Sequence, residues 1–135
     1  MYLGIMTETT ETSEQIVRDF LGSWESRNLD TICDGFADDA VYHNVPVQPI
    51  EGIDGIRAVF QGFLDAFSAA KLDVVSLAAA PGLVLAERID YFTMNDGRKV
   101  VLPVTGVFEV KNGKITRFSD YFDLADFEAQ SGLRL

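Results

Sequence analysis

The sequence predicts an α+β fold in which helices pack across a strongly curved sheet of mixed, mainly antiparallel strands. Apolar residues recur at helical spacing in two stretches of the first half, 13–27 and 53–70. From Leu72 onward they alternate along the chain instead, and short turn sequences interrupt the alternation. Helices followed by a run of strands are typical of α+β proteins. A bent sheet with helices across its mouth encloses a pocket, which we expect to be apolar.

The elements of the first half each have a local signal. Thr12 and Gln15 form a capping-box pattern at the start of the first helix. Pro46 and Pro49 restrict the segment around them to a loop or the edge of a sheet. The predicted elements are helices over 13–27, 28–36 and 53–70, a turn at 38–39, a short strand over 40–45 and a loop or edge segment over 46–52.

In the second half, turn sequences separate four alternating segments. Asn95-Asp96-Gly97 and Asn112-Gly113 are typical of hairpins, because Asn and Gly tolerate positive φ angles. A Pro81-Gly82 pair ends the first segment. The predicted elements are strands over 72–80, 83–94, 98–110 and 115–124 and a last helical turn over 125–130.

Length and composition exclude several classes of protein. A chain of 135 residues is the usual size of one domain, which we place at 13–135 after a flexible leader at 1–12. The net charge of −10 argues against binding to nucleic acids or anionic membranes, since both need clustered Lys and Arg. The leader has no signal-peptide pattern, and no apolar run is long enough to span a membrane. The single cysteine, Cys33, suits the cytoplasm and is expected to pack in the core.

Three charged residues fall among apolar neighbours on the predicted strands. Arg88 and Asp90 share a strand face with Val84, Ala86 and Phe92 because side chains alternate between the two faces. On the last strand, by the same rule, Asp120 shares its face with Thr116, Phe118 and Phe122.

Burying charge is costly unless the charge is paired, so a structural salt bridge, or a solvated face of the sheet, also explains the Arg-x-Asp pair. Tyr42 and Asn44 share a face of the short strand. His43 lies on the opposite face, where we expect a packing or surface role.

Several kinds of catalytic site find no support in the sequence. One His and one Cys without a metal-binding spacing argue against a zinc site. No nucleophile-elbow motif, phosphate-binding glycine loop or dinucleotide fingerprint is present. If the protein is an enzyme, its chemistry comes from carboxylates, Tyr, Asn and Arg.

Four motifs resemble those of the limonene-1,2-epoxide hydrolases, and the resemblance extends from about residue 14 to 130. The motifs are Tyr42-His43-Asn44-Val45-Pro46, Glu87-Arg88-Ile89-Asp90, Leu102-Pro103-Val104-Thr105-Gly106-Val107-Phe108-Glu109 and Asp120-Tyr121-Phe122-Asp123. The resemblance implies a six-stranded cone shared with ketosteroid isomerases and nuclear transport factor-like proteins, and a homodimer. One departure is Phe118-Ser119, where the family often has Trp-Arg before the aspartate.

The resemblance also implies roles for five residues. Arg88, Asp90 and Asp120 correspond to the catalytic Arg and Asp residues, and Tyr42 and Asn44 to the pair that holds water. Under this hypothesis Asp120 is the general base and Asp90 the general acid in one-step hydration of an epoxide. No cofactor or metal is expected.

The predicted ligand is a small lipophilic or cyclic epoxide, similar to limonene-1,2-epoxide. Ordinary core packing is the alternative for each residue expected to line its pocket, namely Val84, Phe92, Leu102, Val104, Phe118 and Phe122. Other functions on the same cone remain open: a ketosteroid isomerase-like or polyketide-cyclase-like enzyme, or a non-catalytic binding module.

Overall fold

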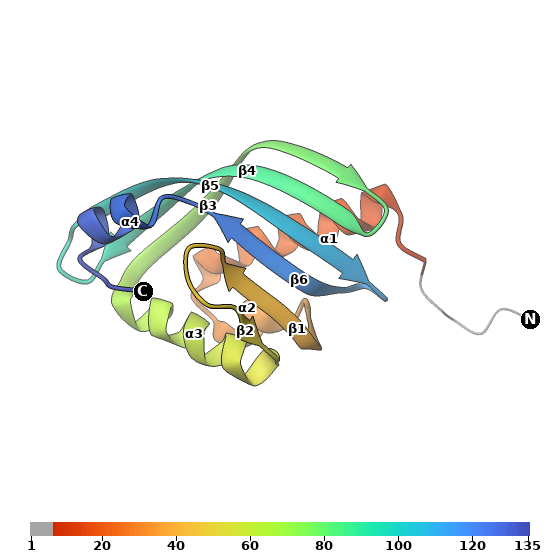
Figure 1. The fold of residues 1–135 in the computed structure, drawn as a ribbon, viewed down its shortest axis with the longest axis horizontal. Coiled ribbons are helices and arrows are strands. Elements are labelled where there is room, and N and C mark those ends of the chain that lie inside the picture. Colours follow the sequence, from red (N-terminus) through yellow and green to blue (C-terminus); the bar gives the residue numbers. More distant parts are fainter. Residues whose placement is uncertain (1–6) are drawn as a thin grey trace, which may run out of the picture.

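The computed structural model describes residues 7–135 and consists of one curved six-stranded sheet with helices packed against it (Figure 1). The strands lie in the order β2-β1-β6-β5-β4-β3, and all neighbours are antiparallel except β1 and β6, which are parallel. In chain order the elements are α1 (Thr10–Ser23), a 3-10 turn η1 (Trp24–Ser26), α2 (Leu29–Cys33), β1 (Phe36–Asn44), β2 (Ile50–Glu51), α3 (Ile53–Ala66), β3 (Phe67–Ala80), β4 (Leu83–Met94), β5 (Lys99–Lys111), β6 (Lys114–Tyr121) and α4 (Leu124–Ser131).

The first helix begins earlier than its sequence pattern predicts. Thr9 is the N-cap of α1, and its side chain forms a capping box with Thr12. The predicted box used Thr12 as the cap and was wrong by one turn, because Thr9 lies three residues before Thr12 and forms the box with it. Residues 10–12 therefore belong to α1 rather than to a flexible leader, while residues 1–6 of that leader lie outside the described part of the chain.

Helix α3 ends at Ala66, four residues before its predicted end, and Phe67 already has an extended backbone. The Arg27 guanidinium donates hydrogen bonds to the carbonyls of Leu64 and Phe67, at this helix end. Unpaired carbonyls at the end of a helix need such donors. Because Arg27 is remote in sequence, the helical pattern of α3 alone does not reveal this end. Helix α2 also ends earlier than predicted, at Cys33 instead of Phe36.

Strand β1 is longer than predicted and includes the Asp38-Asp39 pair that the sequence assigned to a turn. Its register with β6 shifts between Phe36 and Val41, so the acidic pair lies in an irregular part of the strand. The proline-containing segment contributes β2 at the sheet edge, in agreement with its prediction as a loop or edge segment. The predicted boundaries of β4 are confirmed, and the last helical turn is confirmed as α4.

A bulge in β6 changes which residues face the core. Val110 of β5 is opposite Ile115, whereas Glu109 is opposite Arg117, so Thr116 is an extra residue in the ladder. Ile115 is completely buried as a result, whereas Thr116 is only half-buried. The predicted placement of Thr116 on the same face as Asp120 is therefore wrong, because simple alternation does not anticipate a bulge.

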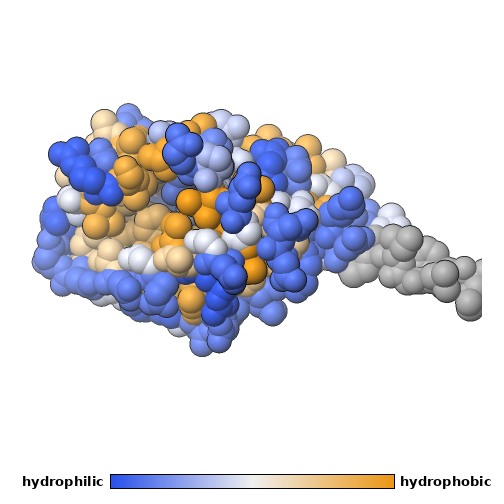
Figure 2. Space-filling view, turned by 60° about the horizontal axis from the view of Figure 1, so that its bottom comes forward, coloured by the Kyte–Doolittle hydropathy of each residue, from blue (hydrophilic) through white to orange (hydrophobic). Residues whose placement is uncertain are grey.

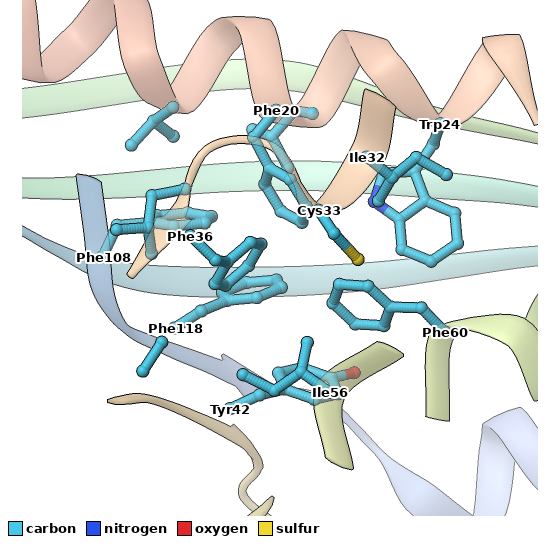
Figure 3. Packing of buried hydrophobic residues seen from close by; sticks show 14 of the residues in the cluster. Phe20, Trp24, Ile32, Cys33, Phe36, Tyr42, Ile56, Phe60, Phe108 and Phe118 are labelled. Carbon is cyan, nitrogen blue, oxygen red and sulfur yellow. The ribbon is translucent and has the colours of Figure 1, made fainter. Parts of the chain in front are cut away.

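The core lies between the sheet and the helices α1 and α3, and is rich in aromatic rings. Figure 3 shows Phe20 of α1 and Phe60 of α3 facing Phe36 and Phe118 of the sheet. Cys33 packs in the same cluster, and burial raises the pKa of its thiol, which agrees with the predicted packing role. Among residues 7–135, no helix is both long and apolar enough to cross a membrane.

Candidate active site

The strand register aligns the polar residues of the site in neighbouring rows. Asp120 of β6 lies between Gly106 of β5 and Asn44 of β1. One row further along β4, Arg88 is opposite Val104, and Asp90 follows on the same face. Strand pairing therefore brings together groups that are far apart in sequence, since neighbouring strands lie only about 4.8 Å apart.

The Arg88 guanidinium binds both carboxylates of the site. Its Nε and Nη2 donate to the two oxygens of Asp90 at 2.9 Å each. Its Nη1 and Nη2 donate to the two oxygens of Asp120 at 2.8 Å each. Such bidentate pairs are strong and fix the relative orientation of the groups. The guanidinium also lies 5.9 Å from the centre of the Phe118 ring.

All three charged side chains are buried. Arg88 is 1% exposed, Asp90 4% and Asp120 7%. Burial raises the pKa of Asp90, and the nearby Asp120 acts in the same direction, while Arg88 opposes both. Burial tends to lower the pKa of Arg88, but the two carboxylates raise it overall, so this residue stays protonated. Two carboxylates and one guanidinium carry a net charge of −1, which one added proton neutralises.

Tyr42 and Asn44 lie beside Asp120. The Tyr42 hydroxyl donates a hydrogen bond of 2.7 Å to Oδ1 of Asn44. Burial, and then the charge of Asp120, raise the pKa of Tyr42, so it remains a neutral phenol. With Oδ1 occupied by Tyr42, the two N–H groups of the Asn44 amide are available to a ligand. His43, on the opposite face of the strand, is half-buried and its Nε2 lies 2.8 Å from the carbonyl of Val47.

An apolar cavity of about 530 Å³, including its opening to solvent, has these polar groups in its wall. Figure 2 shows a hollow lined by hydrophobic residues on the molecular surface, with hydrophilic residues around it. The lining residues are Trp24, Tyr42, Asn44, Phe60, Phe63, Phe67, Leu72, Arg88, Asp90, Phe92, Leu102, Val104, Phe118, Asp120, Phe122, Phe127 and Leu135. A mainly apolar cleft with a few convergent polar groups is typical of a small-molecule site.

Five of the six apolar residues predicted to line a pocket do line this cavity, namely Phe92, Leu102, Val104, Phe118 and Phe122. Val84 does not. It is completely buried opposite Phe108, one row beyond Ala86 and Gly106, where the sheet packs against the core. Alternation placed Val84 on the correct face of β4, but it did not show that this part of the strand lies beyond the cavity.

Sequence reasoning missed the lining residues that come from helices and from the chain end. Trp24, Phe60, Phe63 and Phe127 have the spacing of ordinary core residues, so no local signal separates them from the core. Within residues 7–135, the Trp24 indole N–H is the one buried side-chain polar group without a hydrogen-bond partner. No cluster of three or more His, Cys, Asp or Glu side chains able to hold a metal ion occurs in this part of the chain.

The fold and the site together define a class: an α+β cone with a charged group of residues in the wall of an apolar small-molecule cavity. A family model described as the limonene-1,2-epoxide hydrolase catalytic domain matches residues 11–132, so the chain belongs to that family. The epoxide hydrolase EphG of Mycobacterium tuberculosis is 36% identical over 131 residues, which cover 90% of this chain and 86% of that protein. The resemblance inferred from the sequence motifs is confirmed.

Solved structures agree on the fold. An LEH-like epoxide hydrolase from M. tuberculosis superposes with a TM-score of 0.79 at 29% identity and covers 90% of both chains. A putative polyketide cyclase from Xanthomonas campestris pv. campestris gives a TM-score of 0.83 at 20% identity, covering 90% of this chain and 98% of the other. A protein with a ketosteroid isomerase-like fold from Catenulispora acidiphila gives 0.77 at 20% identity, covering 89% and 94%. The predicted α+β cone is confirmed.

Proposed function

We propose that the protein is an epoxide hydrolase, which adds water to a cyclic or lipophilic epoxide of the limonene-1,2-epoxide type and releases a vicinal diol. The observation that carries this proposal is one guanidinium bridging two buried carboxylates in the wall of an apolar cavity. Such a pair can share one proton, which provides an acid and a base at once. Opening an epoxide in one step needs both.

Asp90 is the general acid in this proposal. It gives its proton to the epoxide oxygen as the C–O bond breaks, and becomes a carboxylate that Arg88 stabilises. The raised pKa of Asp90 supports this role, because a carboxyl whose pKa is raised by burial holds its proton to higher pH than an exposed one and can act as a donor.

Asp120 is the general base and takes a proton from the attacking water. Tyr42 and Asn44 offer this water the remaining hydrogen bonds. The Asn44 N–H groups can donate to the water oxygen, and the Tyr42 oxygen, whose own proton is given to Asn44, can accept the second water proton. Water oxygen then bonds to carbon as Asp120 receives the first proton. The site ends with its proton on Asp120, and transfer back to Asp90 resets it.

The apolar lining supports a lipophilic substrate, and the chemistry above uses no cofactor or metal. We further propose that the protein works in the cytoplasm, as its cysteine content indicates, and forms a homodimer. The outer face of the sheet supports dimerisation, because it exposes large hydrophobic residues that a second copy can cover. These are Val75, Leu83, Leu85, Tyr91, Val101 and Tyr121.

The direct test is an assay of terpene, cycloalkene, styrene and steroid epoxides with the purified protein, followed by chiral analysis of the diols. Wild type is expected to hydrolyse at least one substrate class. Asp90→Asn and Asp120→Asn are each expected to lower kcat by about 100-fold or more, within the range of general acid–base catalysis, and to stay folded by circular dichroism. Near-normal turnover by either variant contradicts the mechanism. Conversion of a conjugating ketone without any diol formation indicates the isomerase-like alternative instead.

A further inference from the structure

Gly106 occupies the point where the Arg88 side chain crosses the sheet. Arg88 starts on β4 and ends at Asp120 on β6, so its guanidinium must pass over the intervening strand β5. On that strand, Val104 is opposite Arg88, and Gly106 is opposite both Ala86 and Asp120. Two small residues of the inner face, Gly106 and Ala86, thus lie side by side where the guanidinium and the second carboxylate meet.

The space above Gly106 is filled by the site itself. A Cβ atom at this position would lie 2.6 Å from Nη1 of Arg88, 2.8 Å from Oδ1 of Asp120 and 3.0 Å from Cε1 of Phe108. These groups have little freedom to move away. Four hydrogen bonds hold the guanidinium between the two carboxylates, and the Phe108 ring stacks on Phe118 with their centres 4.5 Å apart.

The backbone does not require glycine here. Gly106 is not among the residues with positive φ, and glycine in the middle of a strand weakens the strand because it costs more conformational entropy and packs no side chain. The space that Arg88 and Asp120 occupy above this position explains the glycine. An unfavourable strand residue at the one position that leaves room for the Arg88–Asp120 pair points to a role in the site.

We propose that Gly106 is a positioning residue, which by lacking a side chain sets Arg88 in bidentate contact with Asp120. The inference rests on the proposed hydrolase function for its consequence in catalysis, but its geometric part is independent of any substrate. Displacing the guanidinium separates the two carboxylates from the group that couples them, so the division into acid and base is lost.

The test combines kinetics with a crystal structure of Gly106→Ala. We expect kcat to fall by about 100-fold, the cost of a misplacement of about 1 Å, with KM changed by less than about threefold because the apolar lining is untouched. The crystal structure is expected to show Arg88 Nη1 beyond hydrogen-bond distance of Asp120, with strand β5 unchanged. Gly22→Ala, at a helix position with no atom near the added methyl group, is the matched control and should retain wild-type activity.

A second background separates positioning from general damage to the strand. Lysine has no counterpart of the Nη1 atom that the new methyl group meets. Adding Gly106→Ala to Arg88→Lys should therefore lower kcat by less than about fivefold relative to Arg88→Lys alone. If Gly106→Ala alone does not fold, the double variant should fold. An equal loss in both backgrounds overturns the proposal, and so does a Gly106→Ala structure with the Arg88–Asp120 bonds intact. If wild type hydrolyses no epoxide, the proposed function fails, while the crystal structure still decides whether Gly106 positions Arg88.

Discussion

At the scale of single residues, the buried Arg88, Asp90 and Asp120 are expensive to keep in the folded protein. Removing charges from water costs several kcal/mol per ion, and the pairing recovers this only when geometry is good and the remaining lone pairs are satisfied. A hydrophobic replacement of the three would pack without that cost. Retaining them in the wall of an apolar cavity is therefore better explained by chemistry than by stability.

The raised pKa of Asp90 predicts how stability changes with pH. Well below about pH 4, Asp90 is protonated in both the folded and unfolded chains. As pH rises, the unfolded chain loses this proton first, so the folded state is progressively destabilised until the raised pKa is passed. Asp90→Asn cannot ionise, and its free energy of unfolding should rise relative to wild type across that window, by at most about 1.4 kcal/mol per pH unit.

Urea denaturation of both proteins at intervals between pH 4 and 8 measures this difference. A difference that stays flat with pH, or one in which wild type gains stability as pH rises, contradicts the direction of the Asp90 pKa shift.

At the scale of elements, α4 forms part of the cavity wall, and the Gln130 side chain ties it to strand β5. The Gln130 amide donates to the carbonyl of Val101 and accepts from its N–H, both at 2.9 Å, in the manner of a neighbouring strand. Val101 lies beyond the part of β5 that pairs with β6, so its backbone groups are free for Gln130. Phe127 of the same helix lines the cavity.

Gln130→Ala should therefore lower the free energy of unfolding by about 1–2 kcal/mol, the usual net value of two lost hydrogen bonds. Hydrogen exchange of the α4 amides should also become faster. Gln61→Ala, at an exposed position where the amide donates a hydrogen bond to Asp65, is the matched control and should change stability by less than about 0.5 kcal/mol. Equal effects of the two substitutions would show that Gln130 does not anchor the helix.

Local pattern predicted most of the elements and the polar residues of the site, and it failed where a distant contact decides the outcome. Alternation on β4 placed Arg88 and Asp90 on one face of the strand with Val84 and Ala86, because that strand is regular, and the structure shows that this is the buried face. The end of α3 depends on Arg27, and the buried Ile115 depends on a bulge opposite Glu109. The cavity wall contributed by α4 and Leu135 requires the tertiary fold, because nothing local distinguishes a lining side chain from a core side chain.

At the scale of the whole molecule, the convex face of the sheet predicts the oligomeric state. Tyr91 and Val101 are neighbours across β4 and β5, and 42% and 47% of their respective surfaces are exposed. We expect sedimentation equilibrium to give twice the mass of one chain. Tyr91→Glu combined with Val101→Glu should shift the protein toward a monomer, because charged groups would be buried in the interface. Gln61→Glu adds charge on α3 instead and should leave the dimer intact; a wild-type monomer contradicts the prediction.

The most direct test of the account is a single turnover in ¹⁸O-labelled water, with enzyme in excess over an epoxide that it hydrolyses. Asp120 is proposed to activate water rather than to attack carbon, so the diol formed in the first turnover should contain the label. The Asp90 and Asp120 carboxylates should remain unlabelled in the recovered protein. An unlabelled diol, with ¹⁸O found afterwards in either carboxylate, would show a covalent ester intermediate and contradict one-step hydration.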